Sequence, residues 1–221
     1  MARLSAVEFE NFRDPRGYRL VWRNTRGQEL REPNRPGSYY VARRTPYRCE
    51  REEDFIKPLK DGLYAAFAGR TLTPENVLEF VTQNGALTPS GFDPDKGDHV
   101  EMIIMHARWM ADLINRPDSR RVSSGTQRIL SRIPDASLEA TIEWDAARQN
   151  YKWVLRPRTL LDGLWLQFGQ SITRGTIIRS CPQCGDFFEC GPGTDRQAHA
   201  KFCSEEHKTR FFSLKRSKRG K

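Results

Sequence analysis

The stretches Cys181-Pro182-Gln183-Cys184-Gly185 and Cys203-Ser204-Glu205-Glu206-His207, with 18 residues between Cys184 and Cys203, decide the fold of the C-terminal part of this chain. A C-x2-C turn closed by a glycine lets two sulfur atoms converge on one point. A cysteine and a histidine further along the chain can complete a tetrahedron around a metal ion. The spacing therefore predicts a metal site whose ligands are Cys181, Cys184, Cys203 and His207.

Three thiolates and one imidazole form a complete ligand shell for Zn²⁺, so we expect a structural zinc ion with no open position for a substrate. A catalytic zinc usually keeps three protein ligands and a water molecule. Two other residues compete for the fourth position. Cys190 precedes a Gly-Pro-Gly loop that would have to fold back toward the ion, and His199 could replace His207 because it lies four residues before Cys203. The identity of the fourth ligand stays open at this point.

Length and composition indicate a water-soluble protein with one main domain and a small appendage. The chain has 221 residues, of which 37% are hydrophobic and 29% are charged. Its apolar runs are shorter than the roughly 20 residues of a membrane-spanning helix, so we expect no membrane partner. The first residues lack the apolar stretch of a secretory signal, which predicts a reducing cytoplasmic location. We expect an N-terminal domain at 1–176 and a metal-binding domain at 177–221.

Apolar periodicity predicts an α+β fold with a mostly helical main domain and short β-hairpins. We expect a strand at 18–22 and a β-hairpin formed by 137–144 and 151–155. Thr73-Pro74-Glu75 and the pair Thr159 and Asp162 are typical of helix starts, and Asp98 is a candidate cap for a further helix. The expected helices cover residues 55–67, 74–84, 100–114 and 160–174.

The positive charge of the chain is concentrated at its ends. The formal net charge is +9, and residues 196–221 hold nine basic side chains against two acidic ones. Phosphate groups are bound by dense clusters of Lys and Arg, so this segment predicts binding to a nucleic acid, with DNA as the expected partner. A solvated tail that binds nothing is the alternative. The candidate contacts with phosphate are Lys208, Arg210, Lys215, Arg216, Lys218 and Arg219.

The segment Cys181-Pro-Gln-Cys-Gly-Asp-Phe-Phe188, together with Lys201-Phe-Cys-Ser204 and the basic run after His207, resembles the C-terminal zinc finger of bacterial CGNR-type proteins. The resemblance covers roughly the last 40 residues. It implies a treble-clef-like or ribbon-like finger and a role in transcription regulation. The chain departs from that family because His207 stands where the family has its last cysteine, and Arg210 only approximates the family arginine.

These observations favour a zinc-binding, DNA-binding regulatory protein, which could also form a homo-oligomer. The runner-up is a protein-interaction adaptor in which zinc only stabilises a small domain. We expect no enzymatic activity, since no phosphate-binding loop or hydrolase motif occurs in the sequence. The least implausible catalytic cluster comprises Asp98, His99, Glu101 and His106.

Overall fold

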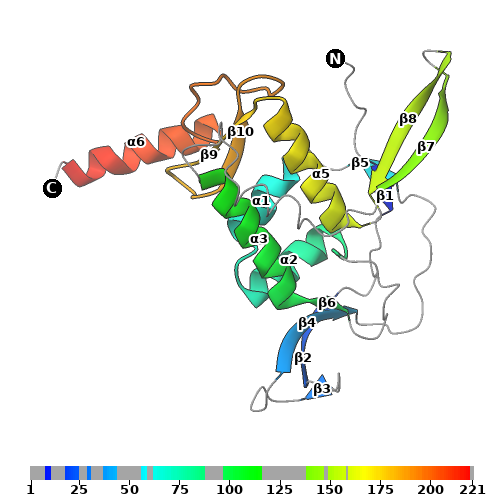
Figure 1. Cartoon of the computed structure of the whole chain (residues 1–221). Coiled ribbons are helices and arrows are strands. Elements are labelled where there is room, and N and C mark those ends of the chain that lie inside the picture. Colours follow the sequence, from blue (N-terminus) through cyan, green and yellow to red (C-terminus); the bar gives the residue numbers. More distant parts are fainter. Residues whose placement is uncertain are drawn as a thin grey trace.

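The computed structural model has an α+β fold, as the sequence predicts (Figure 1). Helices gather around one core, and short antiparallel sheets lie at its edges. None of the described helices is long and apolar enough to cross a membrane. The structure describes residues 8–10, 18–24, 29–30, 37–43, 56–58, 62–87, 97–115, 138–146, 149–157 and 159–219.

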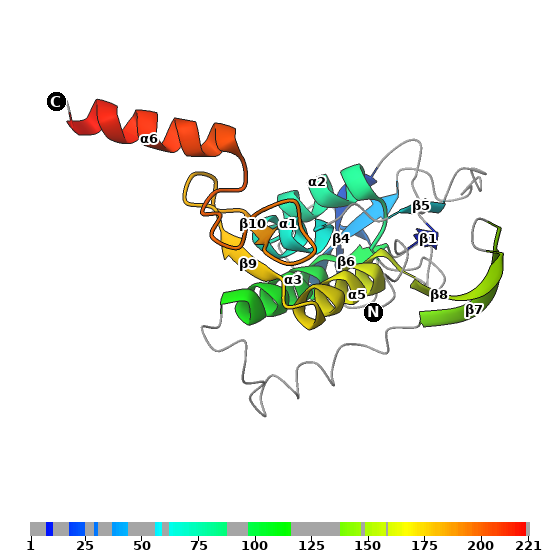
Figure 2. The same ribbon diagram turned by 90° about the horizontal axis from the view of Figure 1, so that it is seen from above.

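Four helices build the core: α1 (Leu63–Arg70), α2 (Pro74–Asn84), α3 (Val100–Asn115) and α5 (Leu160–Thr173). Helix α1 packs against both α3 and α5, which lie on the same side of it in the view from above (Figure 2). Each helix turns its apolar side chains inward, because burying apolar surface is the main favourable term in folding. The largest fully buried side chains of these helices are Tyr64, Phe67, Val77, Val81, Val100, Ile103, Met110, Leu160, Leu164 and Phe168.

Side-chain caps fix the starts of two helices where the sequence predicts them. The hydroxyl of Thr73 accepts the backbone N–H of Asn76 at 3.3 Å, with Pro74 in the first helical position. The hydroxyl of Thr159 accepts the N–H of Asp162 at 2.9 Å. Such caps satisfy N–H groups that have no partner within the helix. The expected helices at 74–84, 100–114 and 160–174 are confirmed within one residue at each end.

The helix expected at 55–67 is wrong in its first half. Ile56–Pro58 form strand β5, which pairs with β1 (Glu8–Glu10) in an antiparallel ladder. Helix α1 begins only after Gly62, whose φ of 70° is left-handed. Pro58 explains the difference, because a proline removes a helical hydrogen bond and also disfavours helical geometry in the residue before it.

A four-stranded antiparallel sheet flanks α2 and α3. Its strands lie in the order β3 (Glu29–Leu30), β2 (Tyr18–Asn24), β4 (Gly37–Arg43) and β6 (Asp98–His99). The strand expected at 18–22 is therefore confirmed as β2. The short β6 continues directly into α3, so the sheet sets the position at which this helix begins.

Strands β7 (Leu138–Asp145) and β8 (Asn150–Pro157) form the predicted β-hairpin, which extends away from the helices (Figure 1). Trp144 and Tyr151 are directly opposite each other near its tip, with ring centroids 5.1 Å apart. Both rings are exposed to solvent. This cross-strand aromatic pair stabilises the tip of a ribbon that lies outside the main core.

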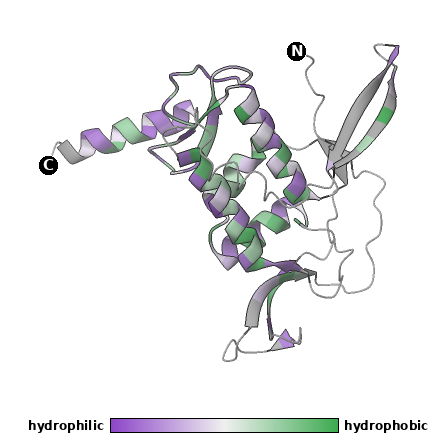
Figure 3. Ribbon diagram, viewed as in Figure 1, coloured by the Kyte–Doolittle hydropathy of each residue, from purple (hydrophilic) through white to green (hydrophobic). Residues whose placement is uncertain are grey.

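Helix α6 (Glu205–Arg219) differs from the core helices in its composition and its position. It is mostly hydrophilic along its length (Figure 3), and it points away from the core in both views of the ribbon (Figures 1 and 2). A helix without an apolar face gains little from packing on a core. Its position must therefore be fixed at the end where it joins the rest of the chain.

His106 is a polar residue inside the helical core. It is only 2% exposed and lies between α3 and α5. The indole N–H of Trp165 donates to its Nδ1 at 3.2 Å, and the ring of Trp109 lies 5.1 Å away. Burial lowers the pKa of His106 to about 4, because a charged imidazolium loses its hydration there.

Acid should therefore destabilise the core through His106. Its folded-state pKa lies below the unfolded value, so the unfolded chain takes up a proton first as the pH falls from about 6.5 toward 4, and stability is lost in that window. The full loss is about 3 kcal/mol. We expect the free energy of unfolding of His106→Gln to fall less between pH 7.5 and pH 5 than that of the unsubstituted protein. Urea titrations at pH 7.5, 6 and 5 measure both. Equal losses in both proteins would contradict this role.

Candidate metal centre

The cluster lies between a β-hairpin and the start of α6. Strands β9 (Ile177–Ser180) and β10 (Phe187–Cys190) pair antiparallel, and the C-x2-C segment forms the turn that joins them. Cys203 lies two residues before α6 begins, and His207 lies in its first turn. The N–H of His207 donates to the hydroxyl of Ser204, which caps the helix. Two separate elements thus supply two donor residues each.

Backbone hydrogen bonds fix the C-x2-C turn. The N–H of Cys181 donates to the carbonyl of Asp186, and the N–H of Gly185 donates to the carbonyl of Cys181, both at 2.8 Å. The hydroxyl of Ser180 donates to the carbonyl of Gly185 at 3.0 Å. Gly185 has a φ of 78°, a conformation in which a residue with a side chain would be strained. The glycine after the second cysteine is therefore required by the turn.

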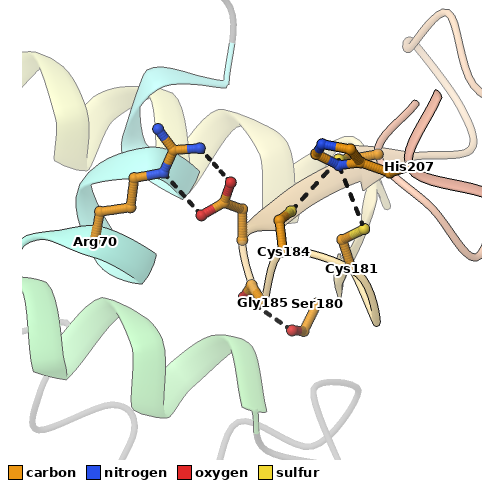
Figure 4. A network of polar contacts seen from close by, with 8 residues as sticks. Arg70, Ser180, Cys181, Cys184, Gly185 and His207 are labelled. Atoms are coloured by element: carbon orange, nitrogen blue, oxygen red, sulfur yellow. Dashed lines mark hydrogen bonds and ion pairs between the residues drawn. The ribbon is translucent and has the colours of Figure 1, made fainter. Parts of the chain in front are cut away.

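The four predicted ligands come together in space. The sulfur atoms of Cys181, Cys184 and Cys203 and a ring nitrogen of His207 all lie within 4.8 Å of one another. The Nδ1 atom of His207 is 2.9 Å from the sulfur of Cys203 and 3.9 Å from that of Cys181, and the sulfurs of Cys184 and Cys203 are 3.7 Å apart (Figure 4). The group could hold a metal ion.

The spacing of these atoms fits one tetrahedral ion. Sulfur and nitrogen donors at about 2.3 and 2.0 Å from a common centre lie about 3.5 to 3.8 Å apart. The distances of 3.7 and 3.9 Å are close to this range. The contact between Cys203 and His207, at 2.9 Å, is shorter and would lengthen with an ion between the two atoms. The four donors fill a tetrahedral shell, so the site suits a structural ion better than a catalytic one.

The thiols of the cluster differ in their tendency to ionise. Burial opposes ionisation of Cys181, but backbone N–H groups of Cys203, Gln183 and Cys184 donate to its sulfur and lower its pKa to about 6. Loss of hydration raises the pKa of the Cys184 and Cys203 thiols. Neighbouring thiolates repel each other, so ionisation of one sulfur opposes ionisation of the next. A bound cation removes this repulsion, which couples metal binding to proton release.

The structure separates the two competing residues from the cluster. Cys190 is fully buried, and its thiol donates to the carbonyl of Ala198 at 3.8 Å. His199 is exposed to solvent. Neither belongs to the group of converging donors found among the described residues. His207 is therefore the fourth member of the cluster.

The basic candidates for phosphate contact lie along α6. Lys208, Arg210, Lys215 and Arg216 are all exposed, and Lys208 forms an ion pair with Glu205 at 3.0 Å. Within the described part of the chain, Arg210, Lys215 and Arg216 have no acidic partner. For Lys218 and Arg219, the structure describes the helical backbone alone.

The four candidates for a catalytic cluster have different surroundings. His99 and Glu101 pair with each other at 3.1 Å, where both side chains are partly exposed. The carboxylate of Asp98 accepts the N–H of Leu87 at 2.8 Å in a buried position. His106 lies in the helical core beside Trp165. The structure therefore does not bring these four residues to one site.

An ion pair joins the metal-binding turn to α1. Both carboxylate oxygens of Asp186 accept hydrogen bonds from the guanidinium of Arg70, one of them at 2.8 Å (Figure 4). This pair lowers the pKa of Asp186. Asp186 follows Cys184 by two residues, and its backbone also bonds the sulfur of Cys184. Residues that hold metal ligands in place in this way tune both the geometry and the affinity of metal sites.

Strand β10 contacts two cores at once. Successive side chains of a strand point to opposite faces. Phe187 packs against the helical core, whereas Phe188 and Cys190 form a second small core with Cys181. The backbone of β10 approaches α1 so closely that a β-carbon at Gly69 would lie 3.5 Å from the backbone nitrogen of Phe187. The metal-binding segment is thus packed directly on the helices.

A hydrogen-bonded group lies on the side of β10 that faces the helices. The hydroxyl of Tyr64 donates to the carboxylate of Glu189 at 2.6 Å and lies 3.0 Å from the hydroxyl of Ser171, which also donates to Glu189. Burial, followed by the bond to Glu189, raises the pKa of Tyr64. Buried polar groups are costly without partners. This network therefore favours one position of β10 relative to α1 and α5.

The residues that link the cluster to the helices cannot be recognised from sequence patterns. Arg70 and Asp186 are 116 positions apart, and Tyr64 and Glu189 are 125 apart. No local pattern marks such pairs. The segment from Asp186 to Cys190 mixes charged and apolar residues without strict alternation, so it does not mark a strand with two different faces.

Comparisons of the chain with family models, with curated proteins and with solved structures gave no match. The geometry of the cluster and the exposed charges of α6 therefore carry the functional argument.

We expect one metal ion per chain, bound through His207 and not through His199. His207→Gln should remove a ligand and lower the metal content below half, whereas His199→Gln should leave it unchanged. Mass spectrometry of the native protein measures the stoichiometry and identifies the ion. Loss of metal from the His199 variant but not from the His207 variant would contradict the cluster described above.

The network around Glu189 should contribute measurably to stability. Tyr64→Phe removes a hydroxyl that is bonded to a partly buried carboxylate, so we expect a loss of about 1–2 kcal/mol in the free energy of unfolding. Tyr151→Phe is the matched control, because Tyr151 is 72% exposed and its change should stay within about 0.5 kcal/mol. Urea denaturation of the metal-loaded protein checks both values. Similar losses in both variants would refute the contribution of the network.

Proposed function

We propose that the cluster holds a zinc ion, which makes it the structural centre of a small zinc finger. Three thiolates and one imidazole in a tetrahedral arrangement are the ligands that structural zinc sites use. Soft sulfur donors disfavour magnesium and calcium. Among the described residues, the small core beside the cluster has Cys181, Phe188 and Cys190 as its buried members, so an ion would supply much of the cohesion of this segment.

We further propose that the zinc finger binds a nucleic acid through α6, with DNA as the expected partner. The observation that supports this most directly is a helix that begins at the metal cluster, points away from the core and exposes basic side chains, of which Arg210, Lys215 and Arg216 have no acidic partner among the described residues. Phosphate groups attract such charges without requiring a particular base sequence. The predicted contacts are Lys208, Arg210, Lys215, Arg216, Lys218 and Arg219.

The position of α6 supports this proposal over a solvated tail. His207 lies in the first turn of α6, so an ion at the cluster would fix the direction of the helix. A fixed helix presents its charges without the full entropic cost of ordering them on binding. Regulation of transcription, suggested by the resemblance to CGNR-type fingers, belongs to the same proposal. So does a cytoplasmic location, where thiols stay reduced and available for zinc.

Removing positive charge from α6 should weaken binding in a salt-dependent way. We expect Lys215→Ala combined with Arg216→Ala to lower the slope of log affinity against log salt by about 1.4 to 1.8, the value for two lost phosphate contacts. Fluorescence anisotropy with labelled oligonucleotides between 50 and 300 mM salt gives the slope.

The matched control is Arg108→Ala combined with Arg174→Ala, which removes the same charge from exposed positions outside α6. Equal slopes for the two double variants would overturn the role of α6. If the unsubstituted protein binds no oligonucleotide but retains a protein partner after nuclease treatment, the chain is an interaction adaptor.

A further inference from the structure

Helix α6 places one exposed aromatic ring among basic side chains. Residues three and four apart share a face of a helix. Phe212 therefore lies on the same face as Lys208, four residues before it, and as Lys215 and Arg216, three and four residues after it. All four side chains are exposed, and the ring of Phe212 retains 44% of its surface. We name these four residues the aromatic-basic face.

Two other rings hold Phe212 in place. Its centroid lies 5.9 Å from that of Phe202 and 5.6 Å from that of Phe211, and the rings of Phe211 and Phe212 are nearly perpendicular to each other. Phe202 also contacts Phe211 at 5.3 Å, and both are only partly exposed. Phe202 packs against the small core that contains Cys181. The ring of Phe212 is therefore held in place by Phe202 and Phe211 and still exposed to solvent. It can bind a planar group with little loss of entropy.

The arrangement of apolar residues on α6 disfavours a second helix as the occupant. Leu214 is the other strongly exposed apolar residue of this helix, at 49%. It lies two residues from Phe212, and positions two apart face different directions. A helical partner needs an apolar stripe at spacings of three and four. Phe212 instead shares its helix face with three basic residues, which suits an anionic ligand with planar groups.

Single-stranded nucleic acid has this combination of chemistry. Its backbone carries phosphates, and its unpaired bases expose flat faces that stack on aromatic side chains. In a duplex the base faces are already stacked on each other, so an exposed phenyl ring gains little there. The pair of Lys208 with Glu205 is exposed and weak, so a phosphate can replace the carboxylate.

We propose that the aromatic-basic face binds single-stranded nucleic acid, with a base stacked on Phe212 and phosphates held by Lys208, Lys215 and Arg216. This inference rests on the proposed nucleic-acid function and specifies its ligand. RNA and DNA share the required chemistry.

The test compares Phe212→Leu, which keeps an apolar side chain but removes the ring, with Leu214→Ala on the opposite face. Fluorescence anisotropy with the full metal-loaded chain uses a 12-nucleotide oligo-dT, a 12-nucleotide oligo-rU and a 12-base-pair DNA duplex. Phe212→Leu should weaken binding to the single strands roughly 5- to 100-fold with an unchanged salt slope, since no charge is lost. Phe212→Tyr and Leu214→Ala should bind like the unsubstituted protein.

A change in the ligand tests the same idea without a change in the protein. Replacing bases of the bound oligonucleotide by abasic sites keeps the phosphates and removes the stacking groups, so we expect a loss similar to that of Phe212→Leu. Tighter binding of oligo-dT or oligo-rU than of the duplex supports the inference. The single strand that binds more tightly is the preferred ligand.

Equal affinity for normal and abasic strands would overturn the inference, as would a preference for the duplex. In those cases the proposed function still stands if Lys215→Ala with Arg216→Ala reduces binding. Absence of binding to all three oligonucleotides would remove both proposals.

Discussion

The structure depends on strand β10, whose alternate side chains belong to two different cores. On one face Phe187 and Glu189 contact the helices, and on the other face Phe188 and Cys190 close the small core beside the metal cluster. The alternation of a β-strand makes this possible within four residues. One face of the strand could not contact both the helical core and the small core. Strand β10 therefore contributes to both contacts of the metal-binding segment, and the cluster beside it sets the position at which α6 begins.

Interactions of different kinds reinforce the contact of β10 with the helices. Gly69 lies close to β10, because a β-carbon at this position would be in van der Waals contact with Phe187. The ion pair between Arg70 and Asp186 lies near solvent, and its strength is correspondingly modest. The network around Glu189 is more deeply buried, so an unmatched group there would cost more. Together they favour one orientation of the turn that carries Cys181 and Cys184.

Local patterns in the sequence predicted the parts of the fold that depend on local chemistry. The C-x2-C turn, the caps at Thr73 and Thr159 and the hairpin of β7 and β8 need only a few neighbouring residues, and each was predicted. The grouping of Cys203 and His207 with the turn also followed from spacing, although the choice between His207 and His199 required the structure. The zinc ion, the nucleic-acid partner and the division of the chain at 176 remain predictions.

The rest could not be predicted, because it arises from contacts between distant positions. The bonds from Arg70 to Asp186 and from Tyr64 to Glu189 join parts of the chain more than 100 residues apart. The helix expected at 55–67 followed apolar periodicity, but Pro58 overrode it. The packing of Phe202 against Phe211 and Phe212, which leaves Leu214 exposed on the same helix, also depends on how α6 is placed relative to the preceding loop.

The attachment of α6 at one end makes this helix a mechanical lever. Its 15 residues span about 22 Å at 1.5 Å per residue, and it is attached through His207 in its first turn. A tilt of about 10° at this attachment point would move the far end of the helix by about 4 Å. Small changes in coordination would therefore be amplified along the helix, and an ion of a different radius would aim its far turns at a different place.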